Sequence, residues 1–420
     1  MELLDQSESE LASYRKYRLA NGLTVFVVQR PHTRTFGMCM ELNCGMRDGS
    51  PHLAHLVEHL VLSRKSDLAE RTGYMNGFTH FAKTRYLMSA HLDKLDSGLE
   101  MMKNVLSPLN VDKKQVRQEI AILAREFSEA GAAQMVIDRE HHRVLGGDEL
   151  SANYKKVFNG MRLKFSAAHA NAFHQAKYQP ANASIAIESP LEPDLIIEKI
   201  SEVVGDFRNS DDPAEGIANT ELADPRKRFH SNWYYRMPSL CMWHKMPQVD
   251  YSDRVALKFL IRILGAGRGR FFDTLRTKNS LCYGVYDGFD VFEDTAWHFA
   301  FVNVSPLKTR RAALLLKQVV ESAKDAMCKE EFENHVLTAV QLCEVVEEDK
   351  FGTLEGLLNW SSGGSGLYTP DDLKKATLEL TPERVADVAR RFFSNENQYW
   401  LLSGSFGPTG YFTVKGLSSK

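Results

Sequence analysis

Apolar and polar positions alternate along this chain with two periods, which predict helices and strands. In the segment 111–127, apolar side chains fall at 116, 120, 123 and 127, the spacing of one helical face. Long helical patterns and short strand-like runs recur in both halves of the sequence. The helical patterns cover 309–327 and 330–348, and the strand-like runs cover 23–30, 36–42 and 296–304. This mixture indicates an α+β fold.

A helix–turn–strand pattern occurs twice and predicts two similar units. In the first half, a helix ending at 173–178 precedes a strand at 183–187. In the second half, a helix ending at 390–393 precedes a strand at 399–402. We expect each unit to be an antiparallel-rich sheet with helices packed on one face.

A polar stretch containing Pro and Gly separates the two halves. It includes 209–216 and 224–227, and this composition is typical of a linker. We therefore expect an N-terminal domain at 1–212, a linker at 213–228 and a C-terminal domain at 229–420.

Composition excludes several classes of protein. The formal net charge of −2 argues against nucleic acid as the main partner, and no run approaches the roughly 20 apolar residues that span a bilayer. The six cysteines are scattered without a Cys-x-x-Cys pair, so we expect reduced, mostly buried thiols. The acidic segment 1–10 lacks the apolar core of a signal peptide, which favours the cytoplasm.

The strongest chemical signal is the sequence His55-Leu56-Val57-Glu58-His59. Ser50 and Pro51 suit the start of a helix just before it. At about 100° per residue, both histidines and the carboxylate share one helical stripe. Neutral imidazole is a good zinc ligand, and Glu58 beside the ion could act as general base for a bound water. This order is the inverse of the commoner His-Glu-x-x-His motif.

Two histidines need a further protein ligand from another element. Glu119 and Glu126, seven positions apart, share one face of the predicted helix at 111–127. Pairing with Arg117 or Arg125 on the helix surface is the ordinary role of such glutamates. His52, one turn before His55, is a rival ligand. From spacing alone, the third ligand remains open.

Several motifs together resemble the pitrilysin family of inverted-motif zinc peptidases, which includes insulin-degrading enzyme and the mitochondrial processing peptidase. The resemblance runs from end to end of the chain. The matching segments are 17–26, the metal helix 54–59, the strand motif Asn76-Gly77-Phe78-Thr79 with 84–86, and the segments 264–276 and 281–285.

The resemblance implies a zinc endopeptidase with one Zn²⁺ per chain and peptide substrates. It assigns His55, His59 and Glu126 as zinc ligands, because the family uses the later of two glutamates seven apart. Glu119 would then support the ligands, with exchanged roles as the alternative. Glu58 would be the catalytic base. Asn76 and Gly77 would bind substrate at a sheet edge, and Arg276 and Tyr283 would face the substrate.

The chain also departs from the family pattern. Only 17 positions separate His59 from Asn76, fewer than is usual, and His52 stands where the family usually has Gly. The stretch 140–146 replaces a more regular His-Pro-Leu-Gly sequence, which leaves substrate specificity near it open.

Half-length members of the family pair to close a chamber, each subunit forming half of a clamshell. Because this chain has both the metal set and the Arg276/Tyr283 pair, we expect a homodimer; a heterodimer with a homologous subunit is the alternative. The rival function is a non-catalytic or structural partner subunit, and a metal-binding module without hydrolysis is a third. The intact metal set favours the peptidase.

Overall fold

A computed structural model describes residues 1–49, 52–64, 73–158, 165–209, 229–232, 238–265, 267–292, 295–361 and 366–418. Side chains are described for these residues except 127–136, 148–158, 232 and 292. The expected helix-start residues Ser50 and Pro51, and the expected linker 213–228, lie outside the described residues.

The described residues form two compact units. The first unit contains the described residues within 1–126, 153–217 and 343–372. The second unit contains the described residues within 127–152, 218–342 and 373–420. The expected boundaries at 212 and 229 assume that each unit is one continuous half of the chain. Instead, residues 127–152 of the first half belong to the second unit, and residues 343–372 of the second half belong to the first unit. The reason is that helices α3 (Lys113–Phe158) and α9 (Lys329–Glu348) each run from one unit into the other.

The first unit is built on a seven-stranded sheet in the order β1-β2-β3-β7-β4-β6-β5. Pairing is antiparallel except between β3 and β7. Strand β5 is therefore an edge strand beside β6. The strands are β1 (Glu2–Glu8), β2 (Ser13–Arg18), β3 (Thr24–Gln29), β4 (Thr35–Leu42), β5 (Tyr74–Thr79), β6 (Thr84–His91) and β7 (Ala183–Ser189).

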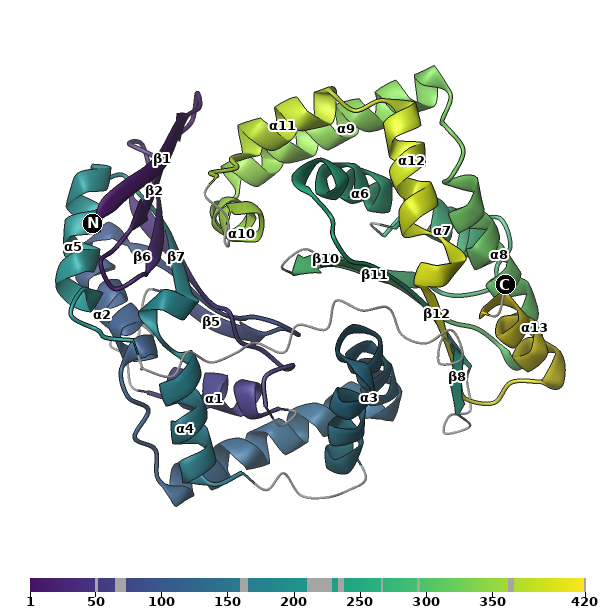
Figure 1. Cartoon of the computed structure of the whole chain (residues 1–420), viewed down its shortest axis with the longest axis horizontal. Helices are drawn as coiled ribbons and strands as arrows, with labels where there is room; N and C mark the ends of the chain where they lie inside the picture. The colour runs from purple at the N-terminus through teal and green to yellow at the C-terminus, as the bar shows by residue number, and fades with distance from the viewer. Residues whose placement is uncertain are drawn as a thin grey trace. The chain divides into compact units, whose positions relative to one another are not determined.

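Helices from the first half of the chain cover one face of this sheet (Figure 1). Close packing there depends on Gly98, because a Cβ at that position would lie 2.7 Å from side-chain atoms of Phe36 and Met38. These helices are α1 (Leu53–Leu62), α2 (Leu95–Leu106), α4 (Ala167–Lys177) and α5 (Pro193–Val204).

Helix α10 (Lys350–Ser361), from the second half of the sequence, covers the opposite face of the same sheet. Its leucines join an apolar cluster with sheet residues such as Phe26 and Val28. Polar contacts hold the middle and the C-terminal end of the helix: Arg85 donates to Glu355 at 3.1 Å, and Lys16 Nζ donates to the Ser361 carbonyl at 2.9 Å. The expectation of helices on one face is therefore incomplete for this unit.

The second unit contains a five-stranded sheet in the order β10-β11-β9-β12-β8, with β12 and β8 parallel and the other pairs antiparallel. Its strands are β8 (Phe229–Asn232), β9 (Ser239–Met246), β10 (Val285–Phe292), β11 (Thr295–Asn303) and β12 (Gln398–Ser403). A large apolar core lies between one face and the helices α6 (Tyr251–Leu264), α8 (Thr309–Ser322), α12 (Pro382–Phe392) and α13 (Pro408–Ser418).

The second part of α3 contacts the other face of this sheet. There the Trp243 indole donates to His141 Nδ1 at 3.2 Å, and Lys245 Nζ donates to the Leu145 carbonyl at 3.2 Å. The remaining elements are α7 (Arg270–Phe272), a π-helical segment (Asp273–Thr277), α11 (Pro370–Leu378) and the 3₁₀ turns Leu92–Lys94, Pro180–Asn182, Pro306–Lys308 and Asn395–Asn397.

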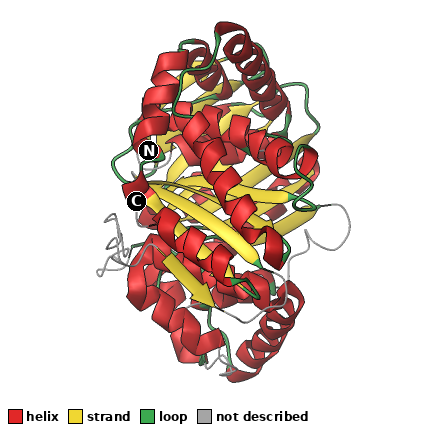
Figure 2. Ribbon diagram, turned by 90° about the vertical axis from the view of Figure 1, so that its right-hand side faces the viewer, coloured by secondary structure: helices red, strands yellow, loops and turns green. Residues whose placement is uncertain are grey.

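The predicted α+β class with two sheets and packed helices is confirmed (Figure 2). The repeated pattern is present in both units as a helix, a 3₁₀ turn and a buried strand: α4 leads to β7, and α12 leads to β12. Within the described part of the chain, no helix combines the length and apolar character needed to cross a membrane.

Candidate active site

The two motif histidines lie one turn apart on α1. Leu56, Val57 and Leu60 are buried beneath the helix and fix its orientation. This leaves His55 and His59 on a half-buried stripe, with ring centroids 4.8 Å apart and ring planes at 81°. The helix begins at Leu53, close to the expected start.

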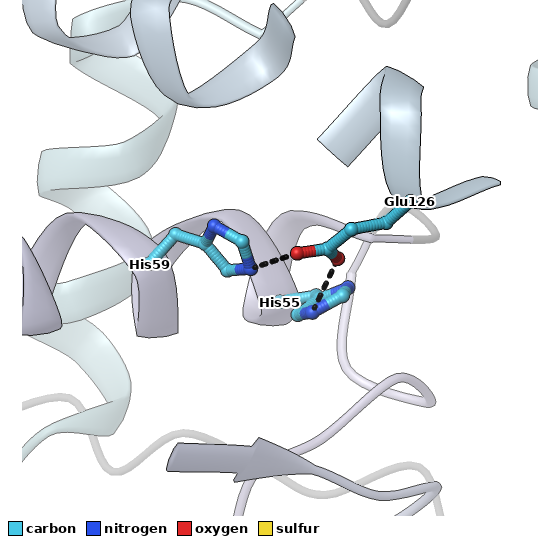
Figure 3. Close-up of side chains that lie close together, drawn as sticks. All are labelled: His55, His59 and Glu126. Atoms are coloured by element: carbon cyan, nitrogen blue, oxygen red, sulfur yellow. Dashed lines mark ion pairs between the residues drawn. The ribbon is translucent and has the colours of Figure 1, made fainter. Parts of the chain in front are cut away.

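Glu126 on α3 points its carboxylate at both rings (Figure 3). Its Oε2 is 3.7 Å from His55 Nε2, and its Oε1 is 3.5 Å from His59 Nε2. The three donor atoms of this set lie within 4.8 Å of one another. Two imidazoles from one helix and a carboxylate from another therefore converge on one point.

The donor chemistry of this set fits a zinc ion. Imidazole nitrogen and carboxylate oxygen are both zinc donors, and three protein ligands are the number found in catalytic sites that keep one position open. Burial and the neighbouring His59 lower the pKa of His55 to about 4, so His55 is neutral at pH 7, as a ligand must be. Glu126 is nearly half exposed, which leaves an approach from solvent.

Glu119 contacts the far side of the same site. Its Oε2 is 3.3 Å from His59 Nδ1, the ring nitrogen that does not face Glu126. A carboxylate in this position orients a ligating imidazole and fixes its tautomer. The rival ligand His52 is not a member of the three-residue donor set. It directly precedes α1 with a φ of 68°, in the left-handed region that favours glycine.

Glu58 is buried between α1 and strand β5. Its Oε2 lies 3.8 Å from His55 Nε2 and accepts a hydrogen bond from the Thr79 hydroxyl at 2.9 Å. Burial, with a smaller contribution from the charge of Glu126, raises the pKa of Glu58 to about 7; the Thr79 hydrogen bond and His59 oppose this shift. A carboxylate with a pKa near neutrality is suited to accept and return a proton at pH 7.

Asn76 and Gly77 lie in the middle of edge strand β5 but face opposite ways. Gly77 packs on Glu58, since a Cβ at position 77 would be 2.6 Å from Glu58 Oε1. Asn76 is the cross-strand partner of Leu87, which belongs to the cluster on the α10 face. The Asn76 amide donates to the Tyr74 hydroxyl at 3.3 Å.

Arg276 and Tyr283 belong to the second unit and lie together. The Arg276 guanidinium is 4.5 Å from the centre of the Tyr283 ring, a cation–π contact. Arg276 sits in the π-helical segment, a conformation often found at functional sites. Tyr283 is 84% exposed and lines a cavity of about 440 Å³ with Cys282 and Tyr286.

Sequence reasoning gave no role to Thr79, whose hydroxyl contacts Glu58. It also missed the close approach of Gly77 to the same carboxylate. Both residues were part of the strand motif, but no local pattern indicates which helix lies against a strand. The free cysteines are only partly as expected: Cys39, Cys44 and Cys241 are buried, while Cys328 is exposed.

Comparisons with known proteins agree with these motifs. A family model described as "Peptidase M16 inactive domain" matches residues 164–338. This range begins after Glu126, so the description does not extend to the donor set. A curated relative, "Zinc protease PqqE" of Helicobacter pylori, is 22% identical over 295 residues, which cover 64% of this chain and 64% of the relative. The alignment thus spans less than two thirds of that protein.

Solved structures share the fold. The peptidase M16 inactive domain from Pseudomonas fluorescens has a TM-score of 0.76 at 16% identity, covering 94% of this chain and 98% of that chain. The first half of the periplasmic protease PqqL from Escherichia coli has a TM-score of 0.70 at 14% identity, covering 100% of this chain and 98% of that one. With the named protease relative, these findings show that the chain resembles the pitrilysin, or M16, family of peptidases and that residues 164–338 match an M16 domain model.

Proposed function

We propose that this protein is a zinc-dependent endopeptidase that cleaves peptides or peptide precursors inside a closed chamber. The observation that carries the proposal is the convergence of His55, His59 and Glu126 beside a buried Glu58. Glu58 has no part in the donor set, so it is available for proton transfer.

His55, His59 and Glu126 would hold the ion, with Glu119 orienting His59. A zinc ion bound there would polarise the scissile carbonyl and lower the pKa of a water molecule to roughly 7. Glu58 accepts the proton of the attacking water and passes it to the leaving amine, which resolves the tetrahedral adduct into two peptides. Its raised pKa supports this role, because one group must both take up and release the proton.

The substrate would lie as an extended peptide along β5, with Asn76 and Gly77 at the point of contact. An edge strand offers free backbone donors and acceptors to such a peptide, so pairing fixes the register without selecting a sequence. Arg276 and Tyr283 would contact the substrate from a second surface, and the exposure of Tyr283 is consistent with this.

Glu58→Gln tests the proposal. We expect hydrolysis of a mixed peptide substrate, followed by mass spectrometry, to fall by about 10²–10⁴-fold, because the substitution removes the general base. Zinc content should stay near one ion per chain. The matched control is Glu100→Gln on α2, an exposed glutamate paired with Lys103. Loss of zinc together with activity would make Glu58 a ligand and contradict the assignment.

We further propose a homodimer whose sites are completed in trans, with Arg276 and Tyr283 of one subunit serving the metal set of its partner. A mixture of inactive Glu58→Gln and inactive Arg276→Ala subunits should regain activity after exchange, because a mixed dimer has one site with both groups wild type. No recovery despite demonstrated subunit exchange would exclude this sharing, and a monomer by light scattering would remove its premise.

A non-catalytic partner subunit in a heterodimer with a homologous chain is the second candidate. The match of residues 164–338 to an inactive-domain model favours it. Such a subunit does not need Glu58, so the candidate predicts that Glu58→Gln leaves the activity of the reconstituted complex unchanged. Hydrolysis by the isolated protein that depends on Glu58 would exclude it.

The expected compartment is the cytoplasm. The Escherichia coli structure named above is of a periplasmic protease, which makes the periplasm the alternative. Fractionation of cells that express the full-length protein from its own gene separates the two: recovery with periplasmic markers would overturn the cytoplasmic expectation.

A further inference from the structure

Strand β5 contacts Glu58 through two residues on the same face. The Thr79 hydroxyl donates to Glu58 Oε2 at 2.9 Å, and Gly77 lies against Oε1. Residues two apart on a strand share a face, so both contacts follow from one strand orientation. Each oxygen of this carboxylate therefore has its own neighbour on β5.

The Thr79 hydrogen bond fixes which oxygen approaches the donor set. The oxygen that accepts it, Oε2, is also the one 3.8 Å from His55 Nε2. The Glu58 side chain is only 4% exposed, so water is a poor substitute for this donor. Without the hydroxyl, rotation about the last bond of Glu58 would no longer be restricted by a directional partner.

Gly77 supplies the space that this arrangement needs. A Cβ there would stand 2.6 Å from Glu58 Oε1 and 2.9 Å from Leu62 Cδ1. Real Cβ atoms do not approach so closely, so a side chain at this position would require Glu58, Leu62 or both to shift.

We infer that Thr79 is a positioning residue for the general base, Glu58. The inference rests on the proposed function and deepens it. Because β5 is also the edge strand on which the substrate would pair, a bound peptide stabilises the strand that orients Glu58. Substrate register and base orientation are thus set by one element.

Thr79→Val and Thr79→Ser test this inference against Thr84→Val. Thr84 is the cross-strand partner of Thr79 and donates to the Cys44 carbonyl at 2.9 Å, so it controls for loss of a buried hydroxyl. We expect Thr79→Val to lower kcat by about 10- to 100-fold, with KM within about twofold and zinc content unchanged. Thr79→Ser and Thr84→Val should stay within about threefold of wild-type kcat. Wild-type kcat in Thr79→Val, or a Thr79→Ser variant as slow as Thr79→Val, would overturn the inference.

In the Glu58→Gln background, Thr79→Val should cause no further loss of activity, since the group that it positions is gone. A full additional loss would show that Thr79 acts elsewhere and would overturn the inference.

A stability cycle separates this inference from the proposed function. In the metal-free protein, Thr79→Val and Glu58→Gln should be coupled by about tenfold in the unfolding equilibrium constant. If the wild-type protein has no Glu58-dependent hydrolysis, the proposed function fails while coupling in this cycle still upholds the contact between Thr79 and Glu58. Additive effects in the cycle would overturn the inference whatever the enzyme activity.

Discussion

Each unit contains a pair of neighbouring histidines, and the two pairs differ in their exposure to solvent and in the groups that they face. His55 and His59 lie on one helix, are partly exposed and turn their Nε2 atoms toward the Glu126 carboxylate. His244 and His298 face each other across β9 and β11, with rings stacked at 6.4 Å and no exposed surface.

The second pair is a structural feature of the core. The Gln398 amide donates to His244 Nε2 at 3.0 Å, and His244 packs against Phe393 with ring centroids 4.7 Å apart. Burial lowers the pKa of His298 to about 3 and holds the pKa of His244 well below its usual range, so both are neutral. Two neighbouring imidazoles thus do not by themselves form a metal site. A carboxylate must point at the same position, and the site must be accessible from solvent.

The largest effect is expected when one member of the donor set in the first unit is removed. His55→Ala or Glu126→Gln should abolish measurable zinc binding and lower peptide hydrolysis by more than about 10³-fold, because two remaining ligands hold zinc poorly. Zinc content by atomic emission and activity assays check this. A chelator should inactivate the wild-type protein and added Zn²⁺ should restore it. Full zinc content in Glu126→Gln would move the ligand role to another residue.

Truncation of His298, in the second histidine pair, should lower the stability of the protein without changing zinc content or activity. His298→Ala leaves a cavity in a fully buried core and should lower the free energy of unfolding by about 2–4 kcal/mol, with zinc content and kcat unchanged. Urea unfolding followed by tryptophan fluorescence measures the loss. The exposed His32→Ala is the control and should change stability by no more than about 0.5 kcal/mol. Zinc loss in His298→Ala would end the contrast between the two pairs.

Glu119→Gln should have an intermediate effect. It weakens the contact with His59 Nδ1 but removes no atom of the donor set, so we expect a loss of about 10- to 100-fold in metal affinity or activity. Competition with a zinc indicator measures the affinity. If Glu119→Gln strips zinc while Glu126→Gln retains it, the two glutamates must exchange roles.

The smallest expected effect is a pH dependence of stability in the metal-free protein. Because the pKa of His298 in the native state is lowered to about 3, the unfolded chain binds a proton that the native chain does not. The contribution of His298 to the free energy of unfolding is therefore fully present above its pKa in the unfolded chain, about 6.5. It falls as the pH drops toward 3, by about 1.4 kcal/mol per pH unit. His298→Leu should flatten the slope of the unfolding free energy between pH 6 and pH 4.5 by that amount. An unchanged slope would contradict a neutral His298.

Local sequence was sufficient for the parts of the site that lie on one element. The spacing of His55 and His59 fixes their common stripe once the segment is a helix, and the period at 116, 120, 123 and 127 predicted the start of α3. The choice of Glu126 over Glu119 came from family resemblance. It remains a prediction, although the geometry around His59 favours it.

Contacts between distant segments were beyond the sequence patterns. Helix α3 continues to Phe158 through Gly146 and Gly147, residues that local rules count as helix breakers. Contacts of His141 and Leu145 with strand β9 accompany this extension, and nothing within the segment reveals them. Thr79 and Gly77 are a similar case, because both contact Glu58 of α1 and the sequence does not show that this helix lies against β5.

The placement of α10 has a consequence for how the protein is made. Phe26, Val28 and Leu87 of the first sheet are covered by leucines at positions 354, 357 and 358. During synthesis, the strands that carry them leave the ribosome long before their cover does. The unit that contains His55, His59 and Glu126 therefore cannot complete its core until most of the second half has been translated, and until then it exposes an apolar sheet face to which chaperones can bind. A nascent chain halted near residue 330 would expose that face, and one long enough for α10 to have left the ribosome would bury it.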